Sequence, residues 1–254
     1  MDDFDYDILE KRIKNETDRK IFQKVFDSAT LKTIHLLATK GLFETLEYII
    51  STGKEAHVFV ATDLSGNKRA VKIYKIETSD FKNMKKYIEG DIRFKEIRKE
   101  KRQIVFIWTK KEFKNLLTAS NKKLSVPLPL GFKDNVLVME FIGHEEASPK
   151  LKDIELTKEQ AETYYQEVIE FMAKLYLAGL VHADLSEYNI LVRDEKLIFI
   201  DIGQAVVLTH PNAKEFFERD VNNIALFFAK RGVKTDFETL YAQIKAYKDK
   251  ISTI

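Results

Sequence analysis

The chain has 254 residues, of which 44% are hydrophobic, 32% charged and 11% aromatic. This balance excludes disordered and fibrous proteins, and the length allows one core or two small lobes. The absence of cysteine excludes disulfides, thiolate metal sites and thiol nucleophiles, so any metal chemistry must use oxygen or imidazole ligands. The apolar stretches are short and the acidic start has no signal-peptide pattern, so we expect a cytoplasmic protein without membrane spans.

The first part of the chain predicts a helix followed by three antiparallel strands. Apolar residues recur at helical spacing over residues 15–39, and Gly41 can end that helix. β-Branched and aromatic residues, with turn residues between them, then predict strands at Leu46–Ile50, Val58–Ala61 and Ala70–Tyr74.

A basic interval follows the third strand. From Lys72 to Arg102 there are 11 Lys and Arg against 6 Asp and Glu, a net charge of +5. We expect a basic flexible insert at about 76–104, either solvated or in contact with an anionic partner.

The remaining elements are mostly helical. A helix is predicted over 108–119 and a hairpin over 130–142, after which Gly143 marks a domain boundary. Capping boxes at Thr157 and Thr235 open two further helices. A short hairpin at 190–200 and a helix at 213–229 lie between those two helices.

Four polar residues suggest phosphoryl transfer. This reaction needs a carboxylate that orients the acceptor hydroxyl and oxygen ligands for a metal that neutralises the phosphates. Asp184 and Asn189, five residues apart, match the base and a metal ligand, and Asp201 after the next hairpin is a second ligand. Lys72 on the third strand can reach the α- and β-phosphates. We therefore predict that ATP is used with Mg²⁺, or with Mn²⁺, and that Asp184, Lys72 and Asp201 are catalytic.

Each of these residues also has a structural interpretation. Lys72 could be a solubilising strand-edge lysine, and Asn189 and Asp201 could cap turns. The order of a Val-Lys strand, a long helix, His-x-Asp-x4-Asn and Asp-x-Gly favours the catalytic interpretation. We interpret His182 as a packing residue, because Asp184 is available as the base.

This order of motifs resembles the RIO family of atypical serine protein kinases, closest to its first subfamily, from about Ile49 to the carboxyl end. The family's phosphate loop, S-T-G-K-E-A-x-V, is matched by Ser51-Thr52-Gly53-Lys54-Glu55-Ala56-His57-Val58. Gly53 would permit a sharp turn, while hydroxyl and N–H groups of 51–55 approach phosphate oxygens and Lys54 adds charge.

The resemblance implies a partner for the strand lysine. Glu112 would be the helix carboxylate that pairs with Lys72, and Glu96 and Glu100 are alternatives. It also implies that backbone groups of a hinge bind adenine; the hinge residues are Met139, Glu140 and Ile142.

The implied architecture is an α+β, reduced two-lobed protein-kinase-like fold with an antiparallel N-lobe sheet and a mainly helical C-lobe. We place a helical extension at 1–45, the N-lobe at 46–143 and the C-lobe at 144–254.

The acceptor is less clear than the nucleotide site. Ala183 stands where many kinases have Arg, and the stretch after Gly203 leaves no room for an activation segment. The resemblance therefore implies autophosphorylation or ATP hydrolysis, with a role in maturation of the small ribosomal subunit and contact with pre-ribosomal particles or rRNA. The alternatives are a small-molecule kinase of the aminoglycoside or choline type and a nucleotide-gated assembly factor with little activity on other proteins.

Overall fold

The computed structural model describes residues 26–77, 80–94 and 100–252. The part of the predicted N-terminal helix before residue 26 lies outside these residues. The chain divides into two compact units. Unit 1 consists of Met1–Lys85, Glu96–Phe113 and Leu128–Phe141, and unit 2 consists of Lys86–Lys95, Lys114–Pro127 and Ile142–Ile254.

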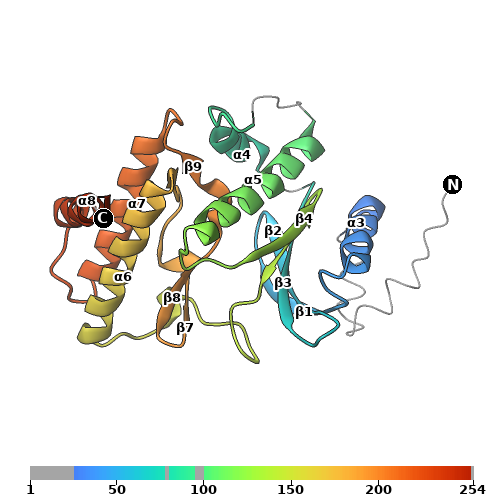
Figure 1. Cartoon of the computed structure of the whole chain (residues 1–254), viewed down its shortest axis with the longest axis horizontal. Helices are drawn as coiled ribbons and strands as arrows, with labels where there is room; N and C mark the ends of the chain where they lie inside the picture. Colours follow the sequence, from blue (N-terminus) through green and yellow to red (C-terminus); the bar gives the residue numbers. More distant parts are fainter. Residues whose placement is uncertain (1–25, 78–79, 95–99, 253–254) are drawn as a thin grey trace. The chain divides into compact units, whose positions relative to one another are not determined.

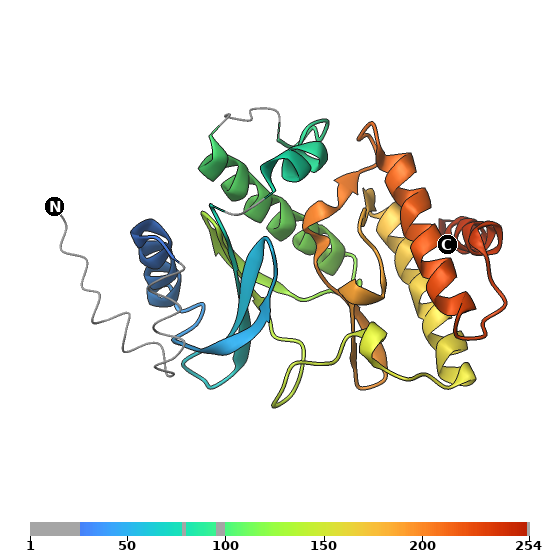
Figure 2. The same ribbon diagram turned by 180° about the vertical axis from the view of Figure 1, so that it is seen from behind.

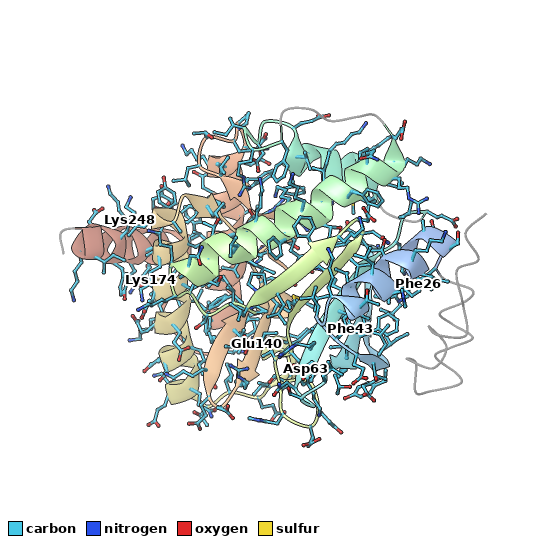
Figure 3. The ribbon with its side chains drawn as sticks, turned by 45° about the vertical axis from the view of Figure 1, so that its right-hand side comes forward. Phe26, Phe43, Asp63, Glu140, Lys174 and Lys248 are labelled. Atoms are coloured by element: carbon cyan, nitrogen blue, oxygen red, sulfur yellow. The ribbon has the colours of Figure 1, made fainter. Side chains whose placement is uncertain are left out.

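A five-stranded antiparallel sheet is the centre of unit 1, in the order β1-β2-β3-β5-β4 (Figures 1 and 2). The strands are β1 (Thr45–Thr52), β2 (Ala56–Thr62), β3 (Lys68–Tyr74), β4 (Pro129–Lys133) and β5 (Val136–Glu140). Asp63, labelled in Figure 3, shapes the β2–β3 turn, because its carboxylate accepts the N–H groups of Ser65 and Asn67, both at 2.9 Å. The predicted strands and hairpin are therefore confirmed.

Helix α3 (Ser28–Thr39) covers one face of this sheet (Figure 1). The side chain of Asp27 caps it by accepting the Thr30 N–H at 2.7 Å. Leu31, Ile34 and Leu37 of the helix join a buried cluster that includes Val71 and Ile73 of β3. Since side chains alternate along a strand, Lys72 and Tyr74 point to the opposite face of the sheet.

The described part of the basic interval contains helical structure. Helix α4 (Phe81–Ile88) forms inside this interval. Helix α5 (Lys101–Asn121) begins before the interval's predicted end at about residue 104. Met84, Tyr87 and Ile88 form a buried stripe at helical spacing among the lysines, so this part of the predicted insert is helical. Counting charge over the whole interval hid this stripe.

Three helices dominate unit 2: α6 (Lys158–Leu177), α7 (Ala213–Ala229) and α8 (Phe237–Ser252). Helix α8 packs against both α6 and α7 (Figure 1). The capping box of α6 forms as predicted, since Gln160 N–H donates to Thr157 Oγ1 at 3.2 Å and Thr157 N–H donates to Gln160 Oε1 at 3.0 Å. These contacts fix the start of the helix that precedes the catalytic loop.

The second predicted capping box does not form. Asp236, one residue later, accepts the Thr239 N–H at 2.8 Å, and the Thr235 hydroxyl bonds the Tyr165 hydroxyl at 2.7 Å instead. An Asp competes well with a Thr as a cap, so the helix begins one residue further on.

Short elements connect the helices of unit 2. They are the strand pairs β6 (Leu180–Val181) with β9 (Val206–Val207) and β7 (Ile190–Arg193) with β8 (Lys196–Phe199), and the 3-10 turns η1 (Leu151–Asp153), η2 (Glu187–Asn189) and η3 (Ile202–Gln204). None of the helices in the described part of the chain has the length and apolarity needed to cross a bilayer.

Candidate active site

A buried ion pair lies on the face of β3 opposite to α3. Lys72 Nζ donates to Glu112 Oε1 at 2.9 Å, and the second oxygen of Glu112 accepts the hydroxyl of Tyr74. Burying such a pair is costly unless its atoms are well bonded, and here both carboxylate oxygens have donors. The structure therefore pairs Lys72 with Glu112, and of the two alternatives Glu96 lies outside the described residues. The result is an ammonium group held in one orientation.

The predicted phosphate loop joins β1 to β2. Its residues Ser51 to Lys54 are exposed, and Val58 on β2 lies opposite Lys72 in the strand register. Lys75 braces the loop: its Nζ donates to the Gly53 carbonyl at 2.7 Å and its N–H to the Glu55 carbonyl at 2.8 Å. The loop is thus shaped before any ligand arrives.

Gly53 differs from its predicted role. It is not among the glycines with positive φ, and a Cβ on it would lie 3.6 Å from the Ala56 carbonyl oxygen, an ordinary contact. Its N–H donates to that same carbonyl at 2.9 Å. The turn itself therefore does not require glycine. Two polar groups of the loop already have partners within it: the Gly53 N–H, and the Thr52 hydroxyl, which bonds His57 Nδ1 at 3.2 Å.

The hinge residues have some of their backbone groups engaged. Glu140 N–H donates to the Leu128 carbonyl at 2.8 Å, and the Ile142 carbonyl accepts the Ser148 N–H at 3.0 Å. Met139 is half-buried and lies opposite Ala70. The binding of adenine by Met139, Glu140 and Ile142 stays a prediction.

In unit 2, two amide side chains hold Asp184. Its Oδ2 accepts Gln204 Nε2 at 2.9 Å and Asn189 Nδ2 at 3.2 Å. Burial and then the charge of Asp201 raise the pKa of Asp184 to about 6. A carboxylate with a pKa near the working pH is suited to accept a proton. Neither the type nor the position of Gln204 in the sequence predicted this contact.

The β7–β8 hairpin brings Asn189 and Asp201 to the same end. Ile200 N–H donates to the Asn189 carbonyl at 2.9 Å, which closes the hairpin one residue before the exposed Asp201. Asp201 has a left-handed backbone with φ of 59°. The Asn189 amide nitrogen donates to the Asp184 carbonyl at 2.8 Å, so its oxygen points the other way and can act as a ligand.

These two residues fit a Mg²⁺ site completed by a nucleotide. Among the described residues, no group of three or more His, Cys, Asp or Glu could hold a metal alone. One carboxylate and one amide oxygen are a partial set, and Mg²⁺ is commonly bound by one or two carboxylates together with substrate phosphates and water. The donor set thus suits a metal that arrives with phosphate.

Two adjacent residues of α7, Arg219 and Asp220, support the loop around Asp184. Asp220, which is buried, accepts the N–H groups of Ala183 and Leu185, both at 2.8 Å, and Arg219 donates to the Ala183 carbonyl. Burial raises the pKa of Asp220 to about 7, although the two N–H bonds favour its charged form. No sequence pattern predicted this support.

His182 is buried under the loop, as interpreted from the sequence. Its Nε2 lies 3.2 Å from the Ile200 carbonyl, and its ring meets Phe171 edge-on at 6.5 Å. Burial lowers the pKa of His182 to about 4, so the ring is neutral at pH 7. It ties the loop to the strand end before Asp201.

Asn115 on α5 anchors the segment after Asp201. Its Nδ2 donates to the carbonyls of Ile202 at 2.9 Å and Ala205 at 3.0 Å. These carbonyls border the η3 turn that carries Gln204, so Asn115 fixes a residue that bonds Asp184. Nothing in the sequence near Asn115 signals this role.

Comparison with known proteins identifies the family. Residues 57–240 match the family model described as the RIO domain. The chain belongs to the RIO family. It is 44% identical to the RIO-type serine/threonine-protein kinase Rio1 of Haloferax volcanii, over 94% of this chain and 82% of that protein. It is also 44% identical to Rio1 of Methanocaldococcus jannaschii, over 95% of this chain and 83% of that protein.

The RIO chain is accordingly a serine/threonine-protein kinase of the first subfamily, as predicted. It is 37% identical to the human serine/threonine-protein kinase RIO1, over 87% of this chain and 40% of that larger protein. Its fold is similar to the crystal structure of the Rio2 kinase from Chaetomium thermophilum, with a TM-score of 0.67 and 23% identity over 86% of this chain and 66% of that one. This likeness confirms the predicted kinase-like α+β fold. The family assignment also disfavours a small-molecule kinase.

Proposed function

We propose that this RIO chain transfers the γ-phosphoryl group of ATP to serine hydroxyl groups, its own included. The observation that carries the proposal is the cluster of Asp184, Asn189 and Asp201. Asp184, which can accept a proton, accepts a hydrogen bond from Asn189, and burial and then the charge of Asp201 raise its pKa. Asn189 and Asp201 are the predicted metal ligands. Kinase chemistry requires this combination of a base and metal ligands.

The roles follow from the contacts. The serine oxygen attacks the γ-phosphorus while Asp184 takes the hydroxyl proton, and the bond from that phosphorus to the bridging oxygen breaks to release ADP. Lys72, fixed by Glu112, would neutralise charge on the α- and β-phosphates. A bound Mg²⁺, or Mn²⁺, held by Asn189 and Asp201, would neutralise the remaining phosphate charge.

Two other acceptors are part of the same proposal. Water in place of serine gives ATP hydrolysis, and a carboxylate gives an acyl phosphate. The solved Rio2 complex carries ADP, Mg²⁺ and a phosphoaspartate, which supports the same cofactors here and makes Asp201 a further acceptor to test. Phosphoserine is stable to hydroxylamine, whereas an acyl phosphate is cleaved by it, so the products distinguish the three outcomes.

The test uses the full chain with γ-labelled ATP and Mg²⁺ or Mn²⁺. We expect hydroxylamine-stable label on the protein, and we expect Asp201→Asn to lower its rate of formation by at least roughly 10²-fold, since a metal ligand is removed. Asp153→Asn, an exposed carboxylate also in unit 2, is the matched control and should behave as the wild type. Absence of label and of released phosphate with the wild type, under both metals, would contradict the proposal.

We further propose a role in maturation of the small ribosomal subunit through contact with rRNA. The support is family resemblance together with the net charge of +5 from Lys72 to Arg102. Cytoplasmic location remains part of this proposal.

The double variant Lys82→Gln/Lys85→Gln on α4 tests whether this charge meets RNA. We expect weaker binding to small-subunit rRNA and a salt slope that falls by about 0.7–0.9 for each phosphate that the variant no longer neutralises. Lys122→Gln/Lys230→Gln removes the same charge elsewhere and should leave the slope as it is. If the α4 variant has the same salt slope as the wild type, this segment does not bind RNA.

A further inference from the structure

Unit 2 contains a cavity of about 260 Å³ that includes none of the catalytic residues. Side chains of α6, α7 and α8, with residues at β6 and just after β9, line it. Its volume is below the roughly 300–1,000 Å³ typical of sites that enclose whole drug-sized ligands. The cavity therefore suits one small group with the rest of the ligand outside.

Three aromatic rings are among the side chains that line this cavity. Phe217 of α7 meets Tyr176 of α6 edge-on at 5.5 Å and Tyr241 of α8 edge-on at 5.8 Å. All three side chains are only partly buried, although they come from three different helices. One face of Tyr241 packs on Phe237, with the ring centroids 5.7 Å apart, and the exposed parts of the three rings offer the remaining π surface to a planar ligand.

Three lysines border the same cavity, and no acidic side chain lines it in the described part of the chain. Lys245 and Lys248 are one turn apart on α8, about 4.5 Å along its axis, and Lys214 is on α7. Lys248, labelled in Figure 3, also lies 5.0 Å from the Tyr176 ring centroid. Two of these lysines are ion-paired, Lys214 with Glu218 at 3.7 Å and Lys248 with Asp249 at 3.9 Å, but neither carboxylate lines the cavity. Three lysines less two carboxylates leave these five groups with a net charge of +1.

We infer that this cavity binds one unpaired base of a single-stranded RNA, with the flanking phosphates on the three lysines. Aromatic side chains that stack on a base, next to cations that follow the backbone, are the general means by which proteins hold single strands. The cavity accepts one planar group, and the lysines stand on two helices on its rim, where phosphates on either side of that base would pass.

An acidic peptide with an aromatic residue is the competing occupant. Peptides are usually held by a free sheet edge, an apolar helix groove or a cluster of arginines. Here the lining is mainly helical, the cations are all lysines, and the cavity is too small for the several side chains that anchor a peptide helix. The observations favour the nucleic acid.

The test measures binding of a fluorescein-labelled ten-nucleotide oligouridylate or oligoadenylate to the full chain by anisotropy, over a range of salt. Tyr241→Leu should raise the Kd by roughly 5- to 150-fold with an unchanged salt slope, since a stacked base loses its partner. Lys245→Gln/Lys248→Gln, at exposed or half-exposed positions, should raise the Kd and lower the slope by about 1.4.

Lys230→Gln/Lys250→Gln is the matched control, because it removes the same charge from the end of α7 and the end of α8 without touching the cavity. It should bind as the wild type. The inference is overturned if this control weakens binding as much as the cavity variant, or if Tyr241→Leu binds RNA normally. It is also overturned if AMP competes as well as the oligonucleotide, or if a Glu- and Tyr-rich peptide binds in its place.

This site goes beyond the proposed phosphoryl transfer and does not depend on it. The cavity variants should retain wild-type autophosphorylation, because they leave Asp184 and its partners in place. Failure of RNA binding at the cavity would also leave the α4 lysines as a separate question, since Lys82→Gln/Lys85→Gln tests them alone.

Discussion

Replacement of Asp184 by Asn is expected to lower kcat for phosphoryl transfer by roughly 10²–10⁴-fold, the usual contribution of a general base. Asn cannot accept the serine proton at neutral pH. The Kd for ATP should change little, since Asp184 is assigned to the acceptor and not to the nucleotide.

The local structure should survive this change. Gln204 and Asn189 both donate to the same oxygen of Asp184, and the Asn side chain keeps one oxygen that can accept those bonds. The variant also removes a buried carboxyl whose pKa lies at about 6 because of burial and the charge of Asp201. The free energy of unfolding should therefore fall little or rise.

The measurement is the single-turnover rate of label transfer at saturating ATP, together with ATP affinity by calorimetry. Asp194→Asn, an exposed carboxylate in the β7–β8 turn whose side chain is 67% exposed, is the matched control and should keep the wild-type rate. If Asp184→Asn retained most of the rate, Asp184 would not be the base, and the assignment of the loop would fail.

Local sequence patterns were enough to predict most elements of both units. The three strands from Leu46 to Tyr74 were readable because their residues are β-branched or aromatic and are separated by strong turn residues such as Asp63. The start of α6 was readable because both bonds of a capping box join residues three apart. Such signals act within a few residues.

The sequence also indicated the residues of the site that lie within a short span. Asp184 and Asn189 are five residues apart, and their hydrogen bond follows from one tight loop. The Lys72–Glu112 pair spans 40 residues and came only from the family resemblance. Their catalytic roles stay predictions until the variants are measured.

The supports of the site could not be predicted, because their partners are distant in the chain. Asn115 reaches Ile202 across 87 residues, and Asp220 reaches Ala183 across 37. A buried Asn or Asp on a helix looks like any surface polar residue until packing removes it from water. Only the folded helices α5 and α7 reveal that these side chains hold the loops.

The largest effect outside the reacting groups is expected at Asp220. In Asp220→Asn the amide offers one oxygen to the two N–H groups of Ala183 and Leu185, so one buried N–H loses its acceptor. An unsatisfied buried donor costs about 1–3 kcal/mol. Removal of the buried carboxyl, whose pKa burial raises to about 7, offsets part of this cost, so the free energy of unfolding at pH 7 should fall by less than this amount. Denaturation in urea measures this decrease.

The same change should slow catalysis, because Asp220 holds the backbone that carries Asp184. Ala183 has a left-handed φ of 65°, which costs an alanine roughly 1–2 kcal/mol, so the loop needs an external restraint to keep this shape. A displacement of about 1 Å at Asp184 can cost up to roughly 10²-fold in kcat. We expect such a fall at a temperature where the variant is fully folded, with a smaller change in KM for ATP. Glu218→Gln on the same helix should change neither value, and a destabilised Asp220→Asn with normal kcat would show that Asp220 supports stability alone.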